Sequence, residues 1–166
     1  MTALYWILCL VAVQRLIELA YARSNTARLR RLGAVEADAG GYPLFVLLHA
    51  GWLVSLALFV PAETQPNWPL LGLFALLQLG RIWVIVSLGG YWTTRIITLP
   101  DAPLVQTGPF RYVRHPNYLL VAAEIALLPL AFGAFAVAGT FSALNLALLA
   151  RRIRIEERVL APRRAV

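Results

Sequence analysis

Residues 108–118 read GPFRYVRHPNY and interrupt a chain whose other long segments are mostly apolar. Pro116 disfavours helical backbone at His115 but suits the first turn of a helix that begins just after it. Gly108 and Pro109 favour a turn shortly before that point. The stretch therefore predicts a junction between a loop and a helix, whose free backbone N–H groups can hold a carboxylate or a phosphate. The alternative is an interfacial turn whose arginines only reach toward water.

The composition around this junction is typical of an integral membrane protein. The 166 residues are 60% hydrophobic and 14% charged, and their mean hydropathy is +0.71. A soluble domain of this length could not bury so much apolar surface, so we expect a single membrane domain over residues 1–166. The net charge is +7 and every basic residue is Arg. In a membrane protein such residues mark cytoplasmic loops, so we expect no nucleic-acid partner.

Five apolar stretches predict transmembrane helices. Each is long enough, or nearly so, to cross a hydrocarbon core of roughly 30 Å. They cover about residues 2–21, 43–60, 68–88, 118–134 and 137–151. The last two are short and are separated only by residues 132–139, which predicts a C-terminal helical hairpin or, alternatively, a re-entrant pair. The expected fold is an all-α integral membrane protein with about five transmembrane helices.

The arginines predict the orientation of these helices. Thirteen of the fifteen lie in the loops 22–42 and 89–117 or in the tail from residue 151, and the loops 61–67 and 133–139 contain none. The positive-inside rule then places the N-terminus outside and the C-terminus in the cytoplasm. Any chemistry is expected on the cytoplasmic side. Aromatic residues at the inner membrane interface would include Tyr21, Tyr42, Tyr91 and Trp92.

A few polar residues lie inside the predicted spans, where they are costly in lipid. Arg15 and Glu18 are three apart on one helix face, so we expect them to pair and to face the bundle. Arg81 and Glu124 form either a structural bridge or part of a substrate pocket. His49 is expected to be a hydrogen-bonded core histidine. With two histidines in the chain and no HExxH motif, no catalytic metal site is expected.

The second half of the chain resembles the isoprenylcysteine carboxyl methyltransferase family. The resemblance is carried by LVQTGPFRYVRHPNY at 104–118, the expected hairpin, and RRIRIEERVL at 151–160. It implies an enzyme that binds S-adenosylmethionine in a cytoplasmic pocket, with residues 1–88 as the first three spans and residues 89–166 as the cofactor-binding half. The first half resembles a bacterial branch thought to O-methylate long-chain polyketides or other lipids, which implies the bacterial inner membrane. Many members have Gly where this chain has Leu120.

The resemblance also implies the site residues. Apolar and aromatic walls would come from Leu104, Val105 and Phe110. The polar parts of the cofactor would be held by His115, Pro116, Asn117, Tyr118 and Glu156. Arg152, one helical turn before Glu156, resembles a substrate-side arginine. The alternative for the last two residues is a surface ion pair, which would stabilise the fold little.

These observations predict an S-adenosylmethionine-dependent O-methyltransferase whose lipophilic acceptor arrives from the lipid bilayer. A carboxylate acceptor needs a cation, for which Arg152 is the candidate. A phenol or enol acceptor needs a base, and His115 or Glu124 would serve. The alternatives are an NADPH-dependent membrane reductase of the sterol-reductase type, which has a similar His-Pro-x-Tyr junction, and a non-enzymatic membrane protein.

Overall fold

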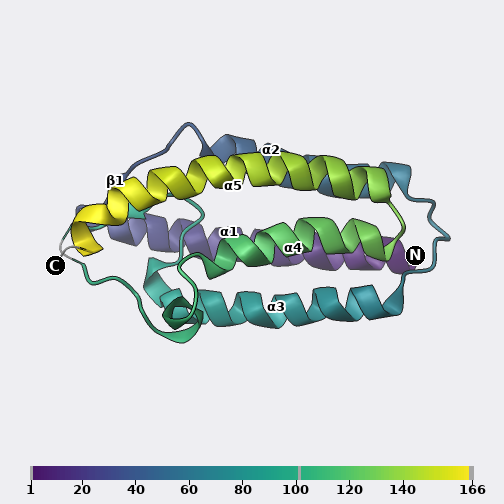
Figure 1. Cartoon of the computed structure of the whole chain (residues 1–166), viewed down its shortest axis with the longest axis horizontal. Helices are drawn as coiled ribbons and strands as arrows, with labels where there is room; N and C mark the ends of the chain where they lie inside the picture. The colour runs from purple at the N-terminus through teal and green to yellow at the C-terminus, as the bar shows by residue number, and fades with distance from the viewer. Residues whose placement is uncertain (1, 101, 165–166) are drawn as a thin grey trace.

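The computed structural model describes residues 2–100 and 102–164, with side chains through Ala161. Within these residues, five α-helices run side by side along the long axis of the molecule (Figure 1). They are α1 (Ala3–Arg31), α2 (Tyr42–Phe59), α3 (Trp68–Leu88), α4 (Pro116–Ala131) and α5 (Phe135–Arg164). Short elements join them: β1 (Val35–Glu36), the 3-10 helix η1 (Gly89–Tyr91), β2 (Ile97–Thr98) and the 3-10 helix η2 (Gly108–Arg111). The prediction of a nearly all-α protein is confirmed.

In the described part of the chain, three helices are long and apolar enough to cross a membrane, namely α1, α2 and α3. The helix α4 is apolar but shorter, with 16 residues. It packs against α3 and α5, and α5 packs against α2, so the last two helices complete the bundle. The chain is therefore a membrane protein, and spans four and five stay a prediction.

The first helix is longer than the sequence predicted. We expected a loop from residue 22, but α1 continues to Arg31. Residues 22–31 contain neither Pro nor Gly, and their Arg, Ala and Leu residues favour helix. The helix ends at Arg31, with Leu32 as its C-cap, just before Gly33 with its positive φ of 90°. Arginines in the last turn also lie favourably at the negative end of the helix dipole.

The last two helices pack against each other as a hairpin, as predicted, and the second continues through the basic tail. Gly133, with φ of 68°, turns the chain between Phe132 and Ala134. The helix α5 then begins at Phe135 and continues to Arg164. The apolar run predicted as the fifth span ends near residue 151, but the helix continues because helix-forming residues follow, as the helical spacing of Arg152 and Glu156 implied.

The largest core cluster occupies the half of the bundle that contains the N-terminus, with buried side chains from all five described helices. There Trp52 of α2 is fully enclosed, and its indole Nε1 donates a hydrogen bond to the backbone oxygen of Ile125 on α4 at 3.2 Å. Nearby, Leu120 of α4 lies against Gly80 of α3, where an added Cβ would be 3.1 Å from the leucine Cδ2. The missing side chain on α3 therefore provides the space for Leu120.

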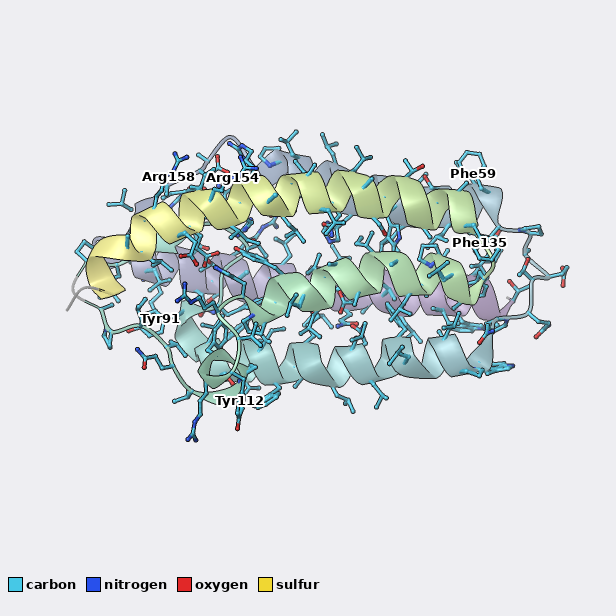
Figure 2. The ribbon with its side chains drawn as sticks, in the orientation of Figure 1. Phe59, Tyr91, Tyr112, Phe135, Arg154 and Arg158 are labelled. Carbon is cyan, nitrogen blue, oxygen red and sulfur yellow. The ribbon has the colours of Figure 1, made fainter. Side chains whose placement is uncertain are left out.

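Much of the outer surface is apolar, as expected for contact with lipid, and polar groups gather at one end. Figure 2 shows Phe59 and Phe135 at the end that contains the N-terminus, and Arg154, Arg158 and Tyr91 toward the other. We call this second end the basic end: of the described residues, it comprises 22–42, 89–100, 102–115 and 151–164. The basic loops predicted to share one side of the membrane do share one end of the bundle (Figure 1).

The loops of the basic end are tied together by a small antiparallel ribbon. In it, β1 pairs with β2, so that Val35 lies opposite Thr98. Glu36 then accepts hydrogen bonds from Arg95, at 2.7 Å, and from Arg30. Burial of Glu36 acts to raise its pKa, but these arginines outweigh that effect and hold the pKa below its usual value. The carboxylate therefore stays charged and connects α1 to the segment before β2.

Trp92 differs from the expectation of an interfacial aromatic residue. It is buried against Ala22 of α1 and Val84 of α3, because η1 turns the chain back over the ends of these helices. The side chain of Asn25 secures this turn by donating hydrogen bonds to the backbone oxygens of Gly89, at 3.2 Å, and of Trp92, at 2.9 Å. The turn directs residues 93–100 and 102–107 across the basic end.

Candidate active site

The turn before α4 has the geometry that the GPFRYVRHPNY stretch predicted. Gly108 has φ of 59°, and a Cβ there would collide with the Ser87 side chain, so glycine is required. Pro109 then lies in the first turn of η2. The backbone of His115 is not helical, and α4 begins at Pro116. The loop-to-helix junction is thus confirmed.

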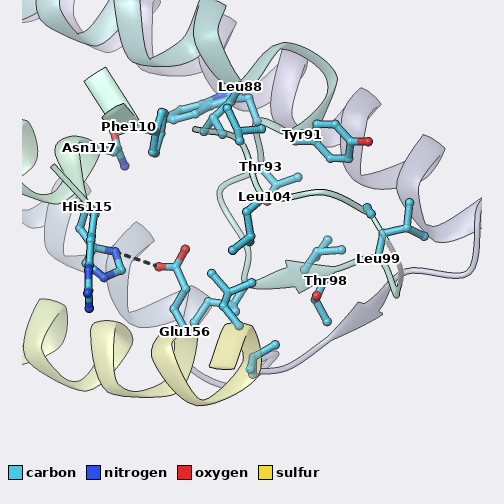
Figure 3. A pocket seen from close by; sticks show the side chains of 18 of the residues that line it. Leu88, Tyr91, Thr93, Thr98, Leu99, Leu104, Phe110, His115, Asn117 and Glu156 are labelled. Atoms are coloured by element: carbon cyan, nitrogen blue, oxygen red, sulfur yellow. Dashed lines mark ion pairs between the residues drawn. The ribbon is translucent and has the colours of Figure 1, made fainter. Parts of the chain in front are cut away.

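A cavity of about 450 Å³ opens beside this junction. Its walls come from the first turn of α4, from the last turns of α5, from the segment around β2 and from the loop that leads to η2 (Figure 3). Its volume lies within the range of roughly 300–1,000 Å³ that is usual for small-molecule sites. The junction is therefore the wall of a cavity as well as a turn.

Every residue that the sequence suggested for cofactor binding lines this cavity. They are Leu104, Val105, Phe110, His115, Pro116, Asn117, Tyr118 and Glu156. Arg152, the predicted substrate-side residue, lines it too. Their functional roles stay predictions, but residues separated by about fifty positions in sequence meet around one space.

Tyr118, in the first turn of α4, connects the two charged residues of α5. Its hydroxyl accepts a hydrogen bond from Nε of Arg152 at 2.9 Å. The same hydroxyl donates a hydrogen bond to the Glu156 carboxylate. The surface ion pair considered for the two charged residues is thus replaced by a tyrosine-bridged group that is partly buried and faces the cavity. The bridge fixes both α5 side chains relative to the start of α4.

His115 adds a titratable group at the same wall. Its ring stacks on that of Tyr118, with 5.4 Å between the ring centroids. Its Nε2 is 2.7 Å from the Glu157 carboxylate, and its Nδ1 is 3.7 Å from that of Glu156 (Figure 3). Because an ionised carboxylate only accepts hydrogen bonds, Nε2 carries the proton in this arrangement. Nδ1 is then the nitrogen that can accept a proton.

The start of α4 also presents a polar atom that lacks a partner among the described residues. No side chain caps this helix, so its first turn keeps the partial positive charge of a helix N-terminus. The side-chain oxygen of Asn117 is buried and has no hydrogen-bond partner among the described residues. A buried amide oxygen without a partner is costly unless a ligand satisfies it. This wall therefore suits a ligand with a carboxylate and a neighbouring hydrogen-bond donor.

The cavity includes residues that the sequence analysis missed. Most belong to two segments, Tyr91–Thr93 and Arg95–Leu99, and the others are Leu29, Leu88, Ala102, Pro103, Gln106, Arg114, Val159 and Leu160. The only signal for the first segment was its place in the long loop before the motif. No local pattern indicated that η1 would direct it back over α1 and α3.

Glu124 lies elsewhere, among charged residues inside the bundle. Arg81 donates two hydrogen bonds to Glu18, at 2.7 and 2.6 Å, and Arg15 donates to Glu18 at 3.0 Å. Glu124 accepts from Arg15 at 2.8 Å, from Arg81 at 3.3 Å and from Gln78 at 3.1 Å. We call Arg15, Glu18, Arg81 and Glu124 the buried ion cluster.

The buried ion cluster answers two questions that the sequence left open. The expected pairing of Arg15 with Glu18 is confirmed, and of the two roles considered for Arg81 and Glu124 the structure shows the bridge. Glu124 is not among the residues that line the cavity. Its role as a base stays a prediction, and His115 is better placed for it. His49 is hydrogen-bonded, as expected, through Nδ1 to the Phe45 backbone oxygen at 2.8 Å.

Comparisons with known proteins identify the family of the chain. The sequence profile of the isoprenylcysteine carboxyl methyltransferase family matches residues 70–162. A Bacillus subtilis (strain 168) protein described as "Uncharacterized protein YpbQ" is 37% identical over 162 residues, which is 95% of this chain and 96% of that protein. A Haemophilus influenzae protein described as "Uncharacterized protein" is 37% identical over 86 residues, or 51% of this chain and 49% of its own. No solved structure matches. The chain belongs to the isoprenylcysteine carboxyl methyltransferase family, and membership implies a methyltransferase that works in a membrane.

Proposed function

We propose that the protein is an S-adenosylmethionine-dependent O-methyltransferase that acts on a lipophilic acceptor from the bilayer. The observation that carries this proposal is the group formed by Tyr118, Arg152 and Glu156 at the wall of the cavity. It places an anion, a cation and an uncapped helix start around one space of suitable size. Such convergent polar groups in a mostly apolar pocket are typical of small-molecule sites.

The residues present fit the groups of this cofactor. The start of α4 and its unpartnered Asn117 oxygen suit the carboxylate and the amino group of a methionine moiety. Glu156 suits a cationic or hydroxyl-bearing part, and Phe110 and Leu104 suit the apolar faces of an adenine. When bound, the cofactor supplies an electrophilic methyl group on a sulfonium, which an oxygen nucleophile attacks in line without a metal.

The task of the protein is then mainly to align the two reactants. A carboxylate acceptor is already ionised and needs a cation beside it, and Arg152 has that charge at the cavity wall. Its guanidinium is held by the Tyr118 hydroxyl and by the Thr94 backbone oxygen, at 2.9 and 3.0 Å, so it presents a fixed orientation. A phenol or enol acceptor needs a base, and the Nδ1 of His115 would take that proton.

The acceptor would enter from the bilayer side, which the apolar outer surface of the bundle permits. The two relatives do not identify the acceptor, because each is described only as an uncharacterized protein. We therefore propose an acceptor class, a long-chain lipid with a carboxylate, phenol or enol group. We further propose that the basic end faces the cytoplasm of a bacterial cell, where the cofactor is available.

The test is ligand-induced stabilisation of the purified protein in detergent. S-adenosylhomocysteine should raise the Tm, because a ligand at about 100 times its Kd stabilises the folded state by roughly 2.7 kcal/mol. NADPH is the informative competitor, since Arg95 and Arg114 also line the cavity and would attract its 2′-phosphate. Stabilisation by NADPH and none by S-adenosylhomocysteine would replace this proposal with a reductase.

A further inference from the structure

A smaller cavity, of about 250 Å³, lies at the basic end on the other side of the segment before β2. It is formed by one face of the last turns of α1, the first residue of α2 and residues 94–95. The lining residues are Arg23, Thr26, Ala27, Arg30, Tyr42, Thr94 and Arg95. It contains three arginines, and its other polar residues carry hydroxyl groups.

The charge in this cavity is only partly compensated. Glu36 forms ion pairs with Arg30 and Arg95. Arg23 has no acidic partner or hydrogen bond among the described residues, and its side chain is exposed. Arg95 is held over the ring of Tyr42, with 4.3 Å from its Cζ to the ring centroid. Two of the three guanidinium groups thus share one carboxylate, and the third, that of Arg23, has no carboxylate partner among the described residues.

The lengths of the candidate spans put this cavity at the level expected for lipid headgroups. Tyr42 is the first residue of α2, an 18-residue apolar helix that is a candidate membrane span. Arg23 follows about twenty residues of α1, which at 1.5 Å per residue reach across a hydrocarbon core of roughly 30 Å. Both residues therefore mark the boundary between lipid tails and headgroups, where arginines meet phosphate groups.

We propose that this cavity binds the phosphate of an anionic membrane lipid, with Arg23 as its principal contact. A guanidinium presents paired N–H donors that match phosphate oxygens, and the hydroxyls of Thr26, Tyr42 and Thr94 offer further donors around the same space. Inorganic phosphate shares this chemistry, but it lacks the acyl chains that the apolar flanks of α1 and α2 would contact at this depth.

The site would also touch the larger cavity through one segment. Arg95 lines both cavities, and the Thr94 backbone oxygen accepts the hydrogen bond from Nη2 of Arg152 at 3.0 Å. A headgroup held by Arg95 would therefore stabilise the backbone that orients Arg152. The lipid site itself does not rest on the methyltransferase proposal, since none of its argument uses the cofactor.

The test titrates purified full-length protein in detergent with short-chain phosphatidylglycerol, with phosphatidylcholine of the same chain length, and with inorganic phosphate. The Tm is followed and the half-effect concentration gives an apparent affinity. Phosphatidylglycerol should stabilise at the lowest concentration. Arg23→Gln should weaken its apparent affinity roughly fivefold, the effect of one arginine near an anionic lipid surface. The matched control is Arg31→Gln, which removes an arginine of the same helix that lies outside the cavity.

A second variant tests the cavity without changing charge. Ala27→Leu fills the space with an apolar side chain, and it should weaken the phosphatidylglycerol response while leaving the Tm without lipid close to that of the wild type. Equal Tm responses to phosphatidylglycerol and phosphatidylcholine would overturn the proposal. Equal losses of apparent affinity for phosphatidylglycerol in Arg23→Gln and Arg31→Gln would also overturn it. Stabilisation by inorganic phosphate at the same concentration as by phosphatidylglycerol would overturn the lipid as the source of the anion.

Discussion

The hydroxyl of Tyr118 on α4 accepts a hydrogen bond from Nε of Arg152 on α5, at 2.9 Å. The same hydroxyl donates a hydrogen bond to Glu156, which lies one helical turn after Arg152 on α5. One neutral side chain thus separates a cation from an anion on the same helix face and joins both to the start of α4. The arrangement ties the cavity wall to the packing of the C-terminal hairpin, so its loss should affect both stability and binding.

Tyr118→Phe removes this bridge and keeps the ring. Two hydrogen bonds to charged groups are lost, so we expect the free energy of unfolding to fall by about 3–6 kcal/mol and the Tm to fall with it. Thermal unfolding in detergent measures the change. Tyr5→Phe is the control, because the Tyr5 hydroxyl has no hydrogen bond among the described residues. Equal Tm values for the two variants would show that the bridge contributes nothing to stability.

Glu156→Gln tests the carboxylate that faces the cavity. Loss of a charge-assisted hydrogen bond of roughly 1.5–3 kcal/mol should weaken S-adenosylhomocysteine about ten- to hundredfold. Isothermal titration gives the affinity. Glu63→Gln, at an exposed position near the opposite end of the bundle, should bind like the wild type. Wild-type affinity in the Glu156 variant would remove this residue from the proposed cofactor site.

Arg152→Ala should separate acceptor chemistry from cofactor binding. If this guanidinium neutralises a carboxylate acceptor, turnover should fall while affinity for S-adenosylhomocysteine changes little, because the uncapped α4 start and Glu156 remain. The measurements are titration and a methyl-transfer assay with a lipid acid. A parallel loss of affinity would instead make Arg152 part of the cofactor site.

The buried ion cluster predicts that the stability of the fold depends on the balance of its charges. Arg81→Gln leaves Glu18 and Glu124 to share Arg15, and an uncompensated buried charge typically costs about 3–5 kcal/mol. The double variant Glu18→Gln/Arg81→Gln keeps the Arg15–Glu124 pair at 2.8 Å and restores neutrality. We therefore expect the double variant to have a higher Tm than Arg81→Gln. A loss of Tm in the double variant equal to the sum of the losses in Glu18→Gln and Arg81→Gln would contradict this coupling.

The ion pair between Asp38 and Arg151 predicts a pH effect at the basic end. The Arg151 guanidinium, which donates at 2.7 and 2.9 Å, holds the pKa of Asp38 below its ordinary value of 3.8. A carboxyl whose pKa is lowered by folding stabilises the folded state at pH values above its unfolded-state pKa. That stabilisation is lost as the pH falls through the folded-state pKa. The Tm difference between wild type and Asp38→Asn should therefore shrink below about pH 4. A difference that stays constant on acidification would show that the pair does not stabilise the fold.

The last prediction concerns orientation in the membrane. Residues 30, 105 and 160 lie at the basic end, and residue 64 lies in the connection at the opposite end. Reporter fusions after the first three positions should score cytoplasmic, and one near residue 64 should score external, because arginine-rich loops stay inside. An external score at 105 would place the cavity outside the compartment that holds S-adenosylmethionine.

The sequence by itself determined the features that depend on local composition. Apolar run length predicted α2 and α3 to within one residue at each end, since hydrophobic length and flanking Pro or Gly set those boundaries. Proline chemistry placed the start of α4, and the motif selected the residues that line the cavity. Hydropathy failed at the ends of α1 and α5, because helix-forming polar residues continue both helices beyond the apolar run.

Only the tertiary structure decided how distant side chains pair. The sequence matched Arg15 with Glu18 on one helix, but the contacts of Arg81 with Glu18 and Glu124 depend on how α1, α3 and α4 are rotated against one another. In the same way, the sequence placed Glu156 one turn after Arg152, while the hydroxyl between them comes from α4. Helix rotation and crossing are set by the packing of the whole interface, and no short stretch of sequence encodes them.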